Sequence, residues 1–271
     1  MKSVKQKQRI KIVIFLTLVF IIFPLIAPWL APHSPLETNF KFVLQPPSKE
    51  YPFGTDQVGR CVFSRVLCGA RISISLVFLL LAILSSLGIL IGIVAGATNR
   101  TVDTLIMRIS DTILAFPDLV LAIAIVGIIG PGTLNTILAL SVIWWTKYAR
   151  FTRILVKEII NDEFVDAGIM AGASWIKIIF IYVLPNITPQ IIIQLALDVG
   201  SMMLTLAGLS FLGLGIQPPT PEWGNMLNEG RIYLQTSPWL LIYPGSAIFI
   251  VVAVFSIQGD IIRDLLDPKE I

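Results

Sequence analysis

The sequence is poor in the residues that soluble enzymes use for chemistry. Its 271 residues include one histidine, two cysteines and only 14% charged side chains. No Gly-Lys dipeptide occurs, which excludes a Walker-type phosphate-binding loop. His33 lies outside every long apolar run, so a Ser-His pair at membrane depth is excluded as well. We therefore expect that the chain is not an enzyme and holds no cofactor or metal ion of its own.

Hydrophobic residues are abundant instead. They make up 55% of the chain, and the mean hydropathy is +0.84, values that describe a polytopic membrane protein. A bilayer core about 30 Å thick needs roughly 20 apolar residues per helix. Runs of about that length predict an all-α fold with six transmembrane helices, at about 12–30, 74–97, 113–129, 134–148, 189–209 and 240–257.

The distribution of lysine and arginine predicts the orientation, because cytoplasmic loops accumulate these residues. Fourteen basic residues fall on the side of the amino terminus and six on the other side, so both termini are expected in the cytoplasm. The side of the amino terminus includes Lys2, Lys5, Lys7, Arg9 and Lys269. A cleaved secretory signal is the alternative for the first run, but no Ala-x-Ala-like site lies near its end. The net charge of +3 then needs no nucleic-acid partner.

Cys61 and Cys68 lie in a segment expected outside the cell. If that segment is helical, seven residues separate their α-carbons by roughly 10 Å, beyond the bridging limit of about 7 Å. We expect two free thiols. His33 is expected to be a solvated loop residue rather than a metal ligand.

Gly88, Gly92 and Gly96 repeat a Gly-x-x-x-Gly pattern on one face of the second run. Such a face lets helix backbones approach closely in lipid, so helix packing is favoured over a role in the substrate path.

Asp198 lies near the middle of the fifth run. An ionisable group at membrane depth is a functional candidate by default, and a hydrogen bond to a neighbouring helix is an equal alternative. Ser201 and Met202 follow on the same helix and complete the candidate translocation path. The soft Met202 thioether could bind a metal, although core packing is favoured.

The segment 149–188 does not resemble a flexible linker. Asn161 and Asp162 are suitable N-cap residues, and Glu163 and Asp166 suit the first turn of a helix. Small residues four apart predict one side that could sit in a groove of another protein. They are Ala167, Gly168, Ala171 and Gly172. Pro185 and Pro189 are expected to break the chain before the fifth helix.

This segment resembles the EAA loop of the membrane subunits of ABC importers, whose pattern is Glu-Ala-Ala, three residues, Gly, nine residues, Ile-x-Leu-Pro. The chain supplies Asp166-Ala167-Gly168, then Gly172, then Tyr182-Val183-Leu184-Pro185. Asp166, Gly168 and Tyr182 depart from the pattern, while the spacing is kept.

Two further stretches are similar to the second permease of the peptide and nickel importers. They are Gly54–Arg60, continuing to Gly69-Ala70-Arg71, and Ser210–Gly215 followed by Gln217–Gly224. Cys61 stands where that family usually has Asp. The resemblance implies an N-terminal part at 1–70, a type I transmembrane domain at 71–260 and a cytoplasmic tail at 261–271.

The resemblance also implies the partners: a second permease subunit, two cytoplasmic ATPases that bind ATP and Mg, and an external solute-binding protein, in a bacterial cell membrane. The coupling residues would be Glu163, Asp166, Ala167, Gly168, Gly172, Leu184 and Pro185. Residues 197–204 look more like nickel-type than dipeptide-type permeases, so nickel or a metal chelate is favoured over di- or oligopeptides. A partner-independent channel or secondary transporter and a structural scaffold are the other classes, and the absence of a sequence duplication disfavours the secondary transporter.

Overall fold

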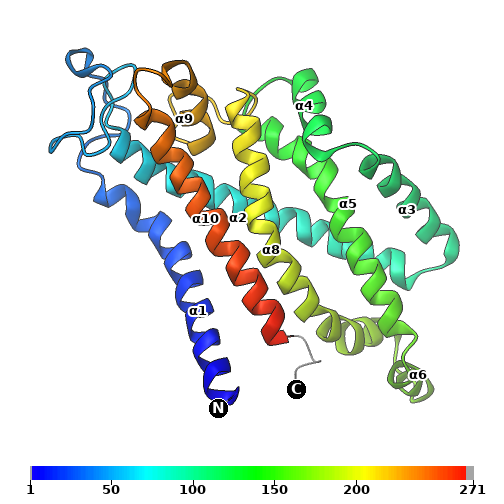
Figure 1. The fold of residues 1–271 in the computed structure, drawn as a ribbon. Helices are drawn as coiled ribbons and strands as arrows, with labels where there is room; N and C mark the ends of the chain where they lie inside the picture. Colours follow the sequence, from blue (N-terminus) through cyan, green and yellow to red (C-terminus); the bar gives the residue numbers. More distant parts are fainter. Residues whose placement is uncertain (1, 267–271) are drawn as a thin grey trace.

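A computed structural model describes residues 2–266, with side chains described for residue 11 and residues 15–265. Those residues form helices and loops without a β-strand, which confirms the all-α prediction for them (Figure 1). The side chains of Lys2, Lys5, Lys7 and Arg9, and all of Lys269, lie outside the described residues. The elements in chain order are α1 (Lys2–Ile26), η1 (Ala27–Leu30), η2 (Phe40–Phe42), α2 (Val62–Ala97), α3 (Arg100–Leu114), α4 (Asp118–Ile129), α5 (Thr133–Ile160), α6 (Glu163–Met170), α7 (Trp175–Lys177), η3 (Ile178–Val183), α8 (Leu184–Phe211), α9 (Trp223–Gly230), η4 (Arg231–Tyr233) and α10 (Trp239–Leu266).

Fewer helices than expected are long and apolar enough to cross a membrane by themselves. Within the described residues there are three, at Val62–Ala97, Trp175–Phe211 and Trp239–Leu265, or four if α3 and α4 count as one broken span. The first predicted span is a shorter apolar stretch, Phe15–Leu30. The expected number of six is therefore not confirmed.

The third predicted span, 113–129, is wrong as a single helix. α3 ends at Leu114, α4 begins at Asp118, and the two helices are bent by 87°. Pro117 explains the break, because proline removes a backbone donor and disfavours helix in the residue before it.

The fourth predicted span, 134–148, ends too early. α5 continues to Ile160, so the first third of the expected coupling loop is helix. Arg150 and Arg153 fall in the predicted loop, whereas Lys147 falls near the end of the predicted span. Each of them is paired with a carboxylate of another helix, which makes a helical path for them acceptable.

The predicted break at Pro185 and Pro189 is also wrong. Residues Trp175–Phe211 run as one helix, with Pro185 in the first turn of α8 and Pro189 inside it. The six residues of η3 just before Pro185 form a π-helix. A wider turn gives the proline ring room against the preceding backbone, so the chain continues in the same direction.

Two hydrophobic cores hold the bundle. The larger one joins α2, α5, α8, α9 and α10 and includes Leu80, Leu84, Leu140 and Leu206, none of which is exposed. The smaller one joins the end of α5, α6, η3 and the start of α8. Because lipid is as apolar as leucine, close packing rather than escape from water stabilises these contacts at membrane depth.

The Gly-x-x-x-Gly face of α2 lies against α5, the most extensive helix contact in the molecule. A Cβ added at Gly88 would lie 2.4 Å from the Cβ of Tyr148, and one at Gly92 would lie 2.6 Å from the carbonyl oxygen of Ala149. At Gly96 it would meet Val156 at 2.7 Å. Any side chain at these positions would push the two helices apart.

Candidate functional site

We call residues 161–183, between α5 and α8, the inter-helix segment. Its first element, α6, begins after Asp162, which occupies the N-cap position but accepts no hydrogen bond with its side chain. Glu163 and Asp166 lie in the first turn, where the helix dipole favours negative charge. The predicted start of this helix is therefore confirmed, but the predicted side-chain cap by Asp162 does not form.

Gly172 ends α6. Its φ of +81° is a conformation that glycine adopts without strain. The N–H of Gly172 donates to the carbonyl of Ile169 at 2.9 Å, and the N–H of Ala173 donates to the carbonyl of Gly168 at 3.0 Å. These two bonds form a Schellman motif, which satisfies carbonyls that the helix end leaves free.

The predicted one-sided face of small residues is therefore split. Gly172 lies beyond the last helical residue, so it does not share a helix face with Gly168. Gly168 is buried and faces the ring of Tyr182, whose Cζ would be 3.0 Å from an added Cβ. Ala167 and Asp166 are exposed on the other side. The sequence could not reveal this arrangement, because the helix ends earlier than the spacing suggested.

The inter-helix segment is fixed to its neighbours by apolar contacts. Val165 is fully buried in the smaller core with Val156 of α5 and Ile178 of η3. The rings of Phe164 and Tyr182 stack with their centroids 6.2 Å apart. Leu184 packs against the same core, while Pro185 is exposed. α6 is thus attached directly to the helix that continues into α8.

The inter-helix segment exposes large apolar side chains, and two of its acidic residues form no ion pair among the described side chains. Met170 is 88% exposed and Ile176 is 72% exposed. Ile169 and Trp175 are exposed as well. Among the described side chains, none forms an ion pair with Glu163 or Asp166. An exposed apolar patch with free charges beside it is typical of a protein-binding surface.

Asp198 lies deeper in the bundle and is nearly inaccessible, with its side chain 3% exposed. Lys147 of α5 donates to its Oδ1 with Nζ at 2.6 Å, and the Gln194 amide donates to its Oδ2 at 3.0 Å. The Lys147 side chain is 41% exposed, and its ammonium lies 5.1 Å from the ring centre of Trp144. Asp198 thus joins α8 to α5 through Lys147, a partner that the sequence did not reveal because the two residues are 51 positions apart.

The two other candidate path residues point in different directions. Ser201 is exposed, whereas Met202 is fully buried in the larger core. Met202 is therefore enclosed by this chain in the described conformation.

Lys147 is the first of a row of basic residues on α5. Arg150 pairs with Asp111, and Arg153 and Lys157 pair with Asp103, both of which belong to α3. The Nη2 of Arg153 lies 2.7 Å from the Oδ2 of Asp103. The spacing of three and four residues along α5 was the signal in the sequence that these side chains share a helix face.

At the opposite end of the bundle, residues 31–61 and 212–238 form loops and short helices, which we call the loop cap (Figure 1). A cluster of four charged residues joins it to α2. Arg60 donates to Asp56 at 2.6 Å and to Glu229 at 3.0 Å, and Arg65 donates to Glu229 at 2.7 Å. Arg65 is 1% exposed. Two sequence stretches almost 170 residues apart therefore meet in one buried network.

Glu222 anchors the second loop of the cap and is fully buried. Its carboxylate accepts hydrogen bonds from the backbone N–H of Gly224 at 2.9 Å and of Asn225 at 2.8 Å, which caps α9. Burial raises the pKa of this carboxyl, and these hydrogen bonds oppose the shift. Trp223 donates from Nε1 to the carbonyl of Val66 at 2.9 Å.

The remaining predictions for this end of the bundle concern the two cysteines and the histidine. Cys61 and Cys68 are free, as expected. The histidine prediction was wrong in detail, because His33 is half-buried and stacks on Tyr51 with ring centres 4.9 Å apart. Within the described residues no group of three or more His, Cys, Asp or Glu side chains could hold a metal ion.

The known proteins to which this chain is similar are permease proteins of peptide and nickel transport systems. Residues 88–271 match the family described as binding-protein-dependent transport system inner membrane component. The Di/tripeptide transport system permease protein DppC of Pseudomonas aeruginosa is 42% identical over 252 residues, which cover 90% of this chain and 83% of that protein. The Nickel transport system permease protein NikC of Escherichia coli is 38% identical, with 90% and 88% covered. The Probable D,D-dipeptide transport system permease protein DdpC of the same species is 40% identical, with 95% and 86% covered.

Proposed function

Because the chain belongs to the binding-protein-dependent transport system inner membrane components, as a permease subunit of the peptide and nickel ABC importers, we propose that it forms half of a translocation pathway. The other half is a second permease subunit. Two cytoplasmic ATPases bind ATP and Mg and supply the energy, and an external solute-binding protein delivers the cargo.

The single observation that carries this proposal is the surface of the inter-helix segment. The segment exposes the apolar side chains of Met170 and Ile176 together with the carboxylates of Glu163 and Asp166, which form no ion pair among the described side chains. A monomer gains nothing from such a surface in water, whereas a groove on an ATPase would bury it. Ala167 leaves room for close approach, and Gly168 and Gly172 fix the shape of the segment from within.

The attachment of α6 supports a direct mechanical role. α6 packs through Val165 onto the start of one continuous helix, Trp175–Phe211, which carries Asp198. A rigid element moves as a body, so displacement of α6 by closing ATPases would tilt the helix that bears the path residues. Leu184 and Pro185 lie inside this connection, in the first turn of α8.

The orientation in this proposal follows from the positions of the ends. α6 lies at the end of the bundle where α1 begins and α10 ends, and the loop cap lies at the other end (Figure 1). Since ATPases are cytoplasmic, both termini are assigned to the cytoplasm and the loop cap to the side that meets the solute-binding protein. The excess of basic residues at the ends of α1 and α5 supports the same assignment.

Asp198 and Ser201 are the residues we assign to the path. Lys147 neutralises Asp198 and joins α5 to α8, so the pair offers polar groups at membrane depth without a net charge. A structural scaffold without transport would predict that Asp198→Ala leaves uptake unchanged.

The cargo is either nickel, as a metal chelate, or a di- or oligopeptide. Residues 197–204 favour the first, while the relatives named for dipeptides and for nickel are about equally similar to this chain. Binding of nickel, nickel chelates and short peptides to the neighbouring solute-binding protein distinguishes them.

Copurification tests the function itself. ATPase subunits should copurify with this chain, and Met170→Glu should reduce both their binding and cargo uptake by more than about tenfold, because a buried anchor contributes about 2 kcal/mol or more. Met170→Leu is the control and should behave like the parent. A chain that transports cargo without any ATPase would be a channel or a secondary transporter, and this result would refute the proposal.

A further inference from the structure

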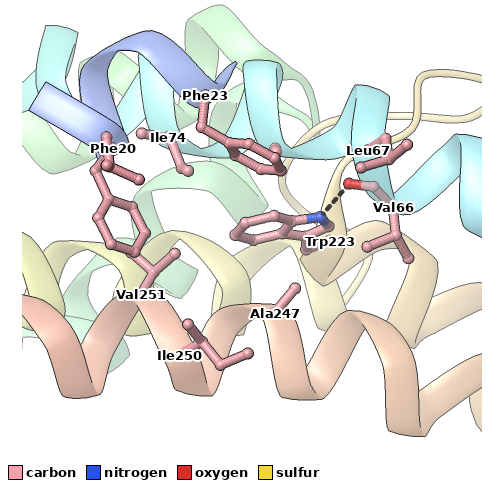
Figure 2. Close-up of a pocket in the computed structure, with 11 residues that line it drawn as sticks. Phe20, Phe23, Val66, Leu67, Ile74, Trp223, Ala247, Ile250 and Val251 are labelled. Atoms are coloured by element: carbon pink, nitrogen blue, oxygen red, sulfur yellow. Dashed lines mark hydrogen bonds between the residues drawn. The ribbon is translucent and has the colours of Figure 1, made fainter. Parts of the chain in front are cut away.

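A cavity of about 250 Å³ lies between α1, α2 and α10 (Figure 2). Phe20 and Phe23 of α1 lie on one side of it, and Ala247 of α10 lies on the other. Trp223 projects between them from α9, and Ala70 of α2 contributes to the lining. The cavity is thus built from segments that are far apart in the chain.

The lining has no free polar group. Its side chains are aliphatic or aromatic, and the single polar atom among them, Nε1 of Trp223, donates to the carbonyl of Val66 at 2.9 Å (Figure 2). Water needs several polar partners, so an apolar cavity of this kind stays dry. Left empty, it would cost packing energy, because its walls lack contacts on one side. Its natural occupant is therefore hydrocarbon.

The cavity opens toward the membrane-facing surface of the chain. Two of its lining residues are themselves exposed, Val19 by 39% and Ile250 by 54%. Their neighbours on the same helices, Ile22 and Phe249, are exposed apolar side chains as well. In a bilayer this surface is covered by lipid, so an acyl chain can enter from the side.

A cation lies on the adjoining face of α2. Arg71 is exposed. It lies four residues after Leu67 and three residues before Ile74, and both of these residues line the cavity. Positions with these spacings share a helix face. Among the described side chains, no carboxylate lies within ion-pair distance of Arg71. A charge along a membrane helix is costly without a partner, and a phosphate binds arginine through two parallel hydrogen bonds.

We propose that this cavity binds one acyl chain of a phospholipid whose phosphate pairs with Arg71. The acyl chain fills the space between α1 and α10 and so holds α1 against the bundle. The site requires only that the chain lies in a membrane, and it is independent of which cargo the importer carries.

Fluorescence of Trp223 tests the site in the assembled importer. Complexes are reconstituted into nanodiscs of phosphatidylglycerol with brominated or plain acyl chains, because bromine quenches tryptophan on contact. The difference between the parent and Trp223→Phe complexes isolates Trp223 from the other five tryptophans and from those of the partners. We expect brominated lipid to remove at least half of that signal.

Cavity-filling variants supply the control. Ala247→Phe should abolish the quenching, whereas Ala82→Phe, at an exposed position of α2 outside the cavity, should leave it unchanged. Native mass spectrometry of detergent-purified complexes gives a second measurement that does not need the Trp223→Phe variant: Ala247→Phe should lose a retained phospholipid that the parent and Ala82→Phe keep.

Arg71→Gln tests the phosphate contact. In this variant the preference of the site for phosphatidylglycerol over diacylglycerol should fall about tenfold, or about 1.4 kcal/mol. An unquenched Trp223 in the parent complex would overturn the proposal. So would quenching that persists in Ala247→Phe, or quenching seen only when this chain is isolated, since the second permease would then occupy the cavity.

Discussion

The charged residues at the two ends of the bundle differ in burial and in pairing. Where the loop cap meets α2, the buried Asp56, Arg60 and Arg65 and the half-buried Glu229 neutralise one another. In the inter-helix segment, Glu163 and Asp166 are exposed without ion-pair partners among the described side chains, next to exposed carbon. In the closed network of the loop cap, each charge has its partner within the same chain. The open surface with free charges is the one that we propose to bind the ATPase.

The largest effect should come from breaking the closed network. Arg65→Ala would leave the buried Asp56 and the half-buried Glu229 beside a single remaining arginine, which costs about 3–5 kcal/mol of folding free energy. The measurement is the thermal unfolding midpoint of the purified complex. Arg231→Ala, at an exposed arginine of the same cap, is the control and should change stability by less than about 0.5 kcal/mol. Equal stability of the two variants would show that the cap is not a closed network.

A smaller effect on folding, with a large effect on transport, is expected at Gly172. Gly172→Glu forces a residue with a side chain to a φ of +81°, which costs roughly 1–2 kcal/mol locally and moves the end of α6. Insertion should remain intact while uptake is lost. Gly172→Asn is the control, because asparagine tolerates this conformation, and it should keep most of the uptake. Normal uptake by Gly172→Glu with normal ATPase binding would contradict the proposed role.

The smallest effect is expected from a single free charge of the open surface. Glu163→Gln removes a favourable interaction with the α6 dipole and should weaken ATPase binding by at most about 1 kcal/mol, with a loss that shrinks as salt is added. The affinity is measured by titrating ATPase subunits into the permease and following ATPase activity at two salt concentrations. Glu158→Gln, an equal change of charge at an exposed position of α5, should have no effect. If the two variants behave alike, Glu163 has no special role in docking.

The sequence predicted features that depend on local rules. The start of α6 follows from residue types that favour a helix N-terminus, and the contact face at Gly88, Gly92 and Gly96 follows from helical periodicity. Asp56 and Arg60, four residues apart, could have been paired from the sequence alone. These features need no knowledge of what lies opposite.

Features that depend on a distant partner could not be predicted. Lys147 lies inside the predicted span 134–148, but its pairing with Asp198, 51 residues away, could not be read from the sequence. Glu229 completes the loop cap from more than 160 residues away. Gly168 turned out to be buried because Tyr182 covers it. In each case the deciding contact depends on tertiary packing, which the spacing of residues in the sequence does not reveal.

The continuity of Trp175–Phe211 has a consequence for insertions and deletions. In one unbroken helix each residue adds about 100° of rotation and 1.5 Å of rise, so the azimuth of α6 relative to Asp198 depends on the number of intervening residues. Adding one residue would turn the two about 100° out of phase, whereas adding four would nearly restore the phase with a shift of about 6 Å. The π-helix at Ile178–Val183 holds more residues per turn than an α-helix, and is therefore the place in the chain where this phase is set.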